Sequence, residues 1–146
     1  MKQRKYLYLQ DEDDEYWIEL DGENYAIRQI IRESNDILHL SCFEDCLAEG
    51  PIIDLSEFNI ISYDTFQQIW NKCISTHDSE WENIKNKYVL GSSVNLRVEC
   101  FYPQGIIMKG SNFIAIYMGN RNFMLHEIVN LKVVQYDDEN HWVIVR

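Results

Sequence analysis

In the C-terminal part of the chain, apolar and polar residues alternate before Gly105, and an apolar run follows it. Val94, Leu96 and Val98 alternate with polar residues before this glycine, and the apolar run 106–108 follows it. Two further segments, 131–136 and 142–145, flank the turn sequence 137–140. Side chains of a strand point alternately to opposite faces, so these segments are predicted to be strands with one buried face. We predict a five-stranded barrel from about residue 88 with these residues pointing inward: Val94, Val98, Ile106, Met108, Val133, Val143 and Val145.

The first forty residues predict an antiparallel meander of four strands. The acidic turn 11–15 separates segment 6–10 from segment 16–20, and the second segment alternates Tyr16, Ile18 and Leu20 with Trp17 and Glu19. Turn residues at 21–24 and 34–36 bound the segments 25–32 and 37–40. Residues 42–49 then predict one or two helical turns, which end at the Gly-Pro pair 50–51.

A helical region follows the meander. Its apolar residues recur at three- and four-residue steps behind a cap at Ser62 or Asp64. A capping box is predicted at 79–82, and either one bent helix or two helices fit the pattern. We expect this region to cover the N-terminal sheet, with Trp70 and Trp81 as buried anchors rather than a ligand site. The predicted fold class is α+β and mostly β, with an acidic meander and helical segment over residues 1–86 and a barrel over residues 87–146.

Charge is distributed unevenly along the chain. The net charge is -11, and the first 86 residues hold 7 Lys and Arg against 19 Asp and Glu, whereas the last 60 hold 6 against 5. An acidic surface repels nucleic acid and anionic membranes and attracts basic proteins at long range. Solubility alone is an equally simple explanation. The carboxylates expected to contact a basic partner lie in two acidic turns: Asp11, Glu12, Asp13, Asp14, Glu15, Glu44 and Asp45.

The stretch from Tyr88 to Arg146 resembles the S-one RNA-binding domain, an OB-type barrel. Gly91 with the alternation that follows it, Gly105 before its apolar run, and the closing strand pair around 137–140 carry the resemblance. The family places aromatic residues beside the central glycine, where bases stack, but Gln104 and Ile107 occupy those positions here. An RNA-binding accessory role, which the resemblance implies, would depend on substitute residues. These are Phe101, Tyr102, Phe113 and Tyr117 for stacking, and Arg97, Lys109 and Lys132 for phosphates.

Motifs for catalysis, metal or cofactors are missing from the sequence. The four histidines are scattered, and the acidic turn 11–15 lacks the glycine and distal glutamate of a calcium loop. Cys42 and Cys46 have no second pair of ligands nearby for zinc, and Cys42 or Cys100 would need an adjacent base to act as a nucleophile. We therefore expect a protein that is not an enzyme and that has no metal and no cofactor. Without a signal peptide or membrane span, a cytoplasmic location with reduced thiols is expected.

Two functional hypotheses follow from the sequence. The first is a bacterial protein of the immunity or antitoxin type, which neutralises a basic, nuclease-like toxin through protein–protein contact. The segregated negative charge and the missing stacking aromatics favour it. The alternative is the RNA-binding accessory role, with weak and salt-sensitive affinity.

Overall fold

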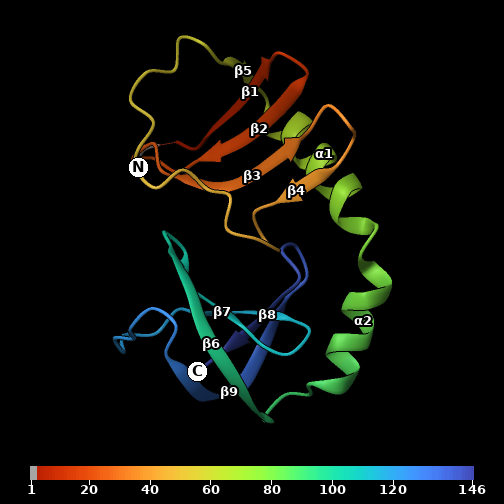
Figure 1. The fold of residues 1–146 in the computed structure, drawn as a ribbon, viewed down its shortest axis with the longest axis vertical. Helices are drawn as coiled ribbons and strands as arrows, with labels where there is room; N and C mark the ends of the chain where they lie inside the picture. Colours follow the sequence, from red (N-terminus) through yellow and green to blue (C-terminus); the bar gives the residue numbers. More distant parts are fainter. Residues whose placement is uncertain (1–2) are drawn as a thin grey trace. The chain divides into compact units, whose positions relative to one another are not determined.

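The computed structural model describes residues 3–146 and contains two compact units, Met1–Ser75 and Thr76–Arg146. Figure 1 labels both helices and strands β1 to β9. An antiparallel sheet with one helix forms the first unit, and a closed barrel with one helix forms the second, which confirms the predicted α+β class. The units divide between Ser75 and Thr76, whereas the predicted boundary followed Asn86. The difference arises because the second helix packs on the barrel.

The N-terminal sheet is antiparallel and has the strand order β4-β3-β2-β1-β5. Its first four strands confirm the predicted meander. The fifth, at the sheet edge beside β1, was not predicted. The elements of this unit are β1 (Lys5–Asp11), β2 (Asp14–Leu20), β3 (Ala26–Arg32), β4 (Leu38–Leu40), β5 (Asn59–Ile61) and α1 (Tyr63–Ser75).

One face of this sheet is covered by the irregular segment 41–58. Leu7, Ile18, Leu20 and Ala26 form the buried core of this face, and Leu47, Ile52, Leu55 and Phe58 of the segment pack against it. Of the one or two helical turns predicted at 42–49, the structure has a single turn at the start, where the Glu44 amide donates to the Leu40 carbonyl at 3.2 Å, and the rest of the segment is irregular. Its apolar side chains are spread along the sheet surface, and packing them there outweighs the local preference for helix.

Helix α1 packs against the strands through the other face of the sheet, as Figure 1 shows. Phe66, Trp70 and Ile74 are its buried residues, at the three- and four-residue steps of an amphipathic helix. The Ser62 side chain accepts a hydrogen bond from the Thr65 amide at 3.1 Å, so Ser62 caps the helix. Trp70 is fully buried, which confirms its predicted role as an anchor.

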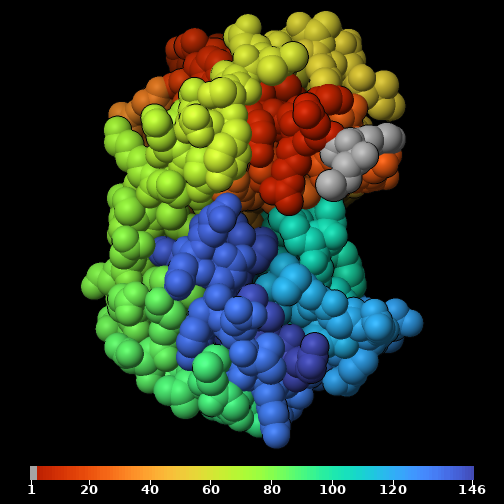
Figure 2. Space-filling view, turned by 180° about the vertical axis from the view of Figure 1, so that it is seen from behind, coloured from red at the N-terminus to blue at the C-terminus, as the bar shows by residue number. Residues whose placement is uncertain are grey.

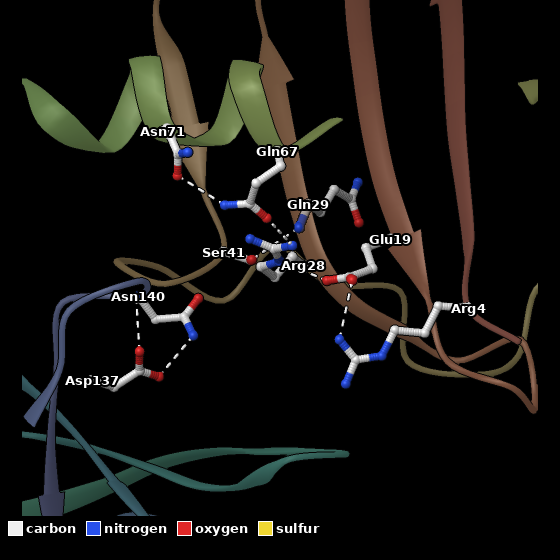
Figure 3. A network of polar contacts seen from close by, with 9 residues as sticks. All are labelled: Arg4, Glu19, Arg28, Gln29, Ser41, Gln67, Asn71, Asp137 and Asn140. Carbon is white, nitrogen blue, oxygen red and sulfur yellow. Dashed lines mark hydrogen bonds and ion pairs between the residues drawn. The ribbon is translucent and has the colours of Figure 1, made fainter. Parts of the chain in front are cut away.

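A buried polar network lies between the sheet and α1. The Arg28 Nε atom donates to Glu19 at 2.6 Å, and its Nη2 atom donates to Gln67 of α1 at 2.8 Å. Figure 3 shows the guanidinium between these two partners. Its carbon also lies 4.9 Å from the centre of both the Phe66 and the Trp70 rings. The network therefore connects three elements of the unit through one charged side chain.

The C-terminal unit is a closed five-stranded barrel with the strand order β10-β8-β7-β6-β9. Strands β8 and β10 are parallel and the other neighbours are antiparallel, an arrangement consistent with an OB-like barrel. Six of the seven residues predicted to point inward are buried, and Ile106 is half-buried against the same core. The elements are α2 (Asp78–Lys87), β6 (Ser93–Tyr102), β7 (Gly105–Lys109), β8 (Ile114–Tyr117), β9 (Ile128–Asp137) and β10 (Trp142–Val145).

Helix α2 belongs to the barrel rather than to the N-terminal sheet. Trp81 is 3% exposed and is part of the barrel core, so its burial is confirmed while the predicted role of its helix is corrected. The predicted capping box at 79–82 is also wrong. The helix begins at Asp78, and the residue before it, His77, makes no side-chain capping bond. Burial of the Trp81 ring in the barrel core therefore places α2 against the barrel.

Gly105 begins β7 directly after the tight turn from β6. A Cβ atom built at this position would lie 2.7 Å from the main-chain oxygen of Tyr117 and 3.0 Å from the Ile116 side chain. Strand β8 pairs here with β7, so the glycine is required by this close approach. Within residues 3–146, no helix combines the length and apolar character needed to cross a membrane.

Candidate protein-binding surface

The acidic turn between β1 and β2 forms an exposed hairpin tip. Asp11 pairs with Asp14 at the ends of the two strands, and Glu12 in the turn has a positive φ of 56°. Asp11, Glu12 and Asp13 are exposed, whereas Asp14 and Glu15 are half-buried. The three exposed carboxylates are therefore available to a partner.

Asp14 and Glu15 hold neighbouring parts of the unit in place. The Asp14 carboxylate accepts a hydrogen bond from the Ser34 amide at 3.0 Å, which ties the β1–β2 turn to the β3–β4 turn. Glu15 accepts a hydrogen bond from the Tyr8 hydroxyl at 2.6 Å and forms an ion pair with Arg32. Arg32 also lies 3.7 Å from Asp36 in the β3–β4 turn. Two acidic turns far apart in sequence thus form one surface.

His39 of β4 extends this surface toward Glu44. Its Nδ1 atom contacts Glu44, and its Nε2 atom lies 3.0 Å from Glu33. Both ring nitrogens face carboxylates, which favours the protonated imidazolium. The pKa of His39 is accordingly raised, mainly by the hydrogen bond to Glu44.

These contacts define a continuous surface, which we call the acidic sheet end. It comprises the two turns with their flanking residues and the turn after β4. Its carboxylates are Asp11, Glu12, Asp13, Asp14, Glu15, Glu33, Asp36, Glu44 and Asp45, and its arginine is Arg32. With His39 counted as neutral, nine carboxylates and one arginine leave about eight negative charges, most of the net charge of this unit, which holds 16 Asp and Glu against 6 Lys and Arg. Ile37 and Leu38, 49% and 44% exposed, add apolar area beside the carboxylates.

The sequence identified seven of these nine carboxylates and missed the other two, Glu33 and Asp36. It also missed His39, which the structure places between two carboxylates. These residues are not close in sequence to the acidic tip. Only the strand register, with β2 paired to β3 and β3 to β4, brings them together. The alternation of the strands was the one signal that could have predicted their proximity.

Most of the rings expected to stack on RNA bases are buried in the C-terminal unit. Tyr102, Phe113 and Tyr117 are 8%, 5% and 4% exposed, and only Phe101 among the four presents a large part of its surface, at 55%. Phe113 packs on Tyr88 at 4.3 Å between ring centres, and Tyr117 packs on Phe123 at 5.1 Å. A buried ring offers no face to a base, so stacking would fall to Phe101 alone.

The outward face of β7 and β8 is aliphatic, although this is the face on which OB-type barrels bind oligonucleotides. Ile107 and Ile116 point away from the barrel interior and are paired across the two strands. They are 6% and 2% exposed. The β9–β10 turn, which also contributes to binding in such barrels, carries Asp137, Asp138 and Glu139. The cations near this location are Lys109, at the end of β7, and Lys85, which binds Asp138 at 2.9 Å.

A second polar cluster joins α2 to the β9–β10 turn. The Trp81 indole donates to Asp138 at 2.7 Å, and Lys85 binds the same oxygen at 2.9 Å. His141, which is 5% exposed, stacks on the Trp81 ring and lies 3.3 Å from Asp78. Burial lowers the pKa of His141, whereas the hydrogen bond from Lys85 is the largest cause that lowers the pKa of Asp138. Sequence reasoning did not group these residues.

Two of the cysteines, Cys46 and Cys73, have raised pKa values. Burial, together with the nearby Glu44 and Asp45, raises the pKa of Cys46 to about 12. Burial also raises the pKa of Cys73. A thiol with a raised pKa is a poor source of thiolate, the nucleophilic form. Among residues 3–146, no three His, Cys, Asp or Glu side chains are grouped so that they could hold a metal ion.

No protein-family model and no curated protein matches this sequence. The acidic sheet end is therefore assessed by its own geometry and charge. It combines exposed carboxylates, a rigid backbone fixed by strand pairing, and adjacent apolar side chains. Its charge is complementary to that of a positively charged surface.

Proposed function

We propose that this protein is a non-catalytic binding protein whose acidic sheet end binds a basic protein. The observation that carries the proposal is the hydrogen bond from Ser34 to Asp14, which joins two acidic turns into one surface. Exposed carboxylates on such a surface raise the rate of association with a basic partner by about 10- to 10³-fold through electrostatic steering. Ile37 and Leu38 supply the apolar contact that a stable complex also needs.

The partner class we favour is a basic, nuclease-like toxin, which makes the protein one of the bacterial immunity or antitoxin type. Such a partner has a positively charged cleft for nucleic acid, and a carboxylate surface occupies the same charges that phosphates would. The barrel, which we infer to be a divergent relative of the S-one type, supports this choice. Gln104 and the buried Ile107 stand where that family has stacking aromatics.

Charge reversal at the hairpin tip tests the proposal. The double variant Asp11→Lys with Asp13→Lys reverses the charge of two exposed residues at the tip. Asp14 is left unchanged, because its substitution would also break the hydrogen bond from the Ser34 amide. The matched control, Glu49→Lys with Glu80→Lys, changes the net charge equally at exposed positions outside the acidic sheet end. The probe is a catalytically inactivated basic ribonuclease. Its rate of association with each variant is measured by stopped-flow fluorescence at low ionic strength.

We expect the tip variant to slow association by about tenfold or more and the control to slow it much less. Equal slowing in both variants would mean that diffuse net charge, not this surface, attracts the probe. No association of the unmodified protein with any of several basic nucleases would also contradict the proposal. Circular dichroism of each variant checks that the fold is retained.

A further inference from the structure

Charge in the C-terminal unit is segregated between two regions. Helix α2 and residues 137–139 contain six of its eight acidic residues: Asp78, Glu80, Glu82, Asp137, Asp138 and Glu139. The rest of the unit contains five basic residues, Arg97, Lys109, Arg121, Lys132 and Arg146, against Glu99 and Glu127. The strands and loops other than the β9–β10 turn therefore carry a net charge of about +3 in a protein of net charge -11.

Strand register places two of these cations in one row. Arg97 of β6 lies opposite Lys109 of β7 on one side and opposite Ile128 of β9 on the other. Paired residues point to the same face of a sheet, and all three are exposed, with Ile128 at 68%. The Arg97 guanidinium contacts Glu99 at 2.7 Å, which orients it on the surface. The row therefore runs across three strands, from Lys109 on β7 through Arg97 on β6 to Ile128 on β9.

An exposed apolar turn adjoins this row. Met124 and Leu125, 77% and 53% exposed, lie in the turn that enters β9. The turn is fixed to β6 because the Val98 amide donates to the Glu127 carbonyl at 3.0 Å and the His126 amide donates to the Val98 carbonyl at 2.8 Å. Met124 and Leu125 are therefore held beside the strand that carries Arg97. The light-blue segment of the C-terminal unit, which includes this turn, projects from the surface in Figure 2.

We propose that Arg97, Lys109, Met124, Leu125 and Ile128, together the methionine–arginine face, bind an acidic segment with apolar side chains on a partner protein. Cations in a row favour carboxylates, and the flexible methionine adapts to apolar side chains of varied shape. Apolar side chains this exposed on a fixed turn are typical of interaction surfaces. The face is distinct from the acidic sheet end and selects partners of opposite charge. It thus goes beyond the proposed function and gives the protein two surfaces for two different partners.

Protein is favoured over RNA as the partner of this face because its exposed apolar groups are aliphatic side chains and a thioether. Binding of single-stranded nucleic acid depends on rings that stack with bases, and none of the five residues has a ring. An acidic peptide with leucines satisfies both the cations and the apolar turn.

The probe is a fluorescein-labelled peptide of about 15 residues with Glu and Leu at helical spacing, long enough to form a helix when bound. A second peptide has Ser in place of every Leu, and a third probe is single-stranded oligouridine. Binding to the full chain is followed by fluorescence anisotropy in about 0.15 M salt. We expect measurable binding of the Glu-Leu peptide and binding at least tenfold weaker, or none, for the other two probes.

Two double variants locate the binding on this face. Arg97→Glu with Lys109→Glu reverses the charged row, and Met124→Ser with Leu125→Ser removes the apolar turn while leaving the strands unchanged. Each should weaken binding of the Glu-Leu peptide by about tenfold or more, equivalent to ~1.4 kcal/mol. Circular dichroism and thermal melting show whether each variant is folded, and the serine variant tests the proposal even if the charge variant is not.

Matched controls change the same residue types elsewhere. Lys72→Glu with Lys87→Glu alters two exposed cations, and Ile53→Ser with Val89→Ser alters two exposed apolar side chains. Both should bind the peptide like the unmodified protein. No binding of the Glu-Leu peptide, equal loss in variants and controls, or tighter binding of oligouridine would each overturn the proposal. None of these results bears on the acidic sheet end, whose test uses a basic probe.

Discussion

Removing the charge of Glu19 is expected to destabilise the N-terminal unit strongly. The Arg28 and Glu19 side chains are 5% and 1% exposed, so Glu19→Gln leaves a buried guanidinium without its carboxylate. Breaking a buried ion pair in this way costs about 3–5 kcal/mol. Gln67 and the rings of Phe66 and Trp70 still contact Arg28 and offset part of this cost. We therefore expect a loss near the lower end, ~3 kcal/mol, or a melting temperature lower by roughly 12–24 °C for a unit of this size.

A double-mutant cycle separates the pair from its surroundings. Arg28→Met removes the cation while retaining a side chain that fills the space, and the double variant with Glu19→Gln leaves no unpaired buried charge. We expect the double variant to be more stable than the sum of the two single losses predicts, with a coupling of about 2–3 kcal/mol. Tyr6, whose pKa is raised to about 12 by burial and by Glu19, should show a lower pKa in Glu19→Gln.

Native-state hydrogen exchange of the β2 and β3 amides gives a readout specific to this unit, with urea unfolding followed by tryptophan fluorescence as the global measure. Far-UV circular dichroism of the folded variants serves as the control for structure. The reasoning is refuted if Glu19→Gln costs less than about 1 kcal/mol, or if the two substitutions are additive within about 0.5 kcal/mol.

Four further outcomes are expected. Trp70→Ala should lower the free energy of unfolding by about 3–5 kcal/mol through the cavity left under α1, and a change below about 1 kcal/mol in urea unfolding would contradict the burial. Gly105→Val should lower the melting temperature measured by differential scanning calorimetry, because its Cβ would collide with the Tyr117 carbonyl. Because burial lowers the pKa of His141, its neutral form contributes fully to the free energy of unfolding above the ordinary pKa of 6.5, and this contribution is lost as the pH falls below 6.5. His141→Gln should therefore flatten this part of a profile of stability against pH. Single-stranded RNA should bind weakly and lose affinity steeply with added salt in a polarisation assay, because Tyr102 and Ile107 are buried and cannot contact bases. Tight, sequence-selective binding would contradict this expectation.

Strand alternation predicted much of the fold, because burial of one face leaves a period of two in the sequence. The barrel strands β6 and β9 show it most clearly, with Val94, Leu96 and Val98 buried between exposed neighbours. Strand β5 could not be found in this way. It has three residues at a sheet edge, Ile60 is 75% exposed, and so the pattern of a half-buried strand is missing.

The helical region shows what local patterns leave undecided. The spacing of Trp81 and Ile84 predicted an amphipathic helix, but amphipathicity does not say which surface the apolar side receives. The acidic sheet end illustrates the same limit for function. The charge of the tip at 11–15 was visible in the sequence, whereas its continuation through Glu33 and His39 depends on which strands pair and in what register.

The parallel pairing of β8 with β10 has a consequence for the order in which the chain acquires structure. Most partners in the N-terminal sheet are joined by short hairpins, so they meet early, whereas β8 must wait for a strand 28 positions further on, as the pairing of Ile114 with Trp142 shows. Until residues 142–145 emerge from the ribosome, β8 and β9 remain open edges that can pair with other chains. During synthesis both units therefore pass through a stage with an open strand edge: β1 in the first unit until β5 is made, because Leu7 pairs with Ile60, and β8 and β9 in the second until β10 is made.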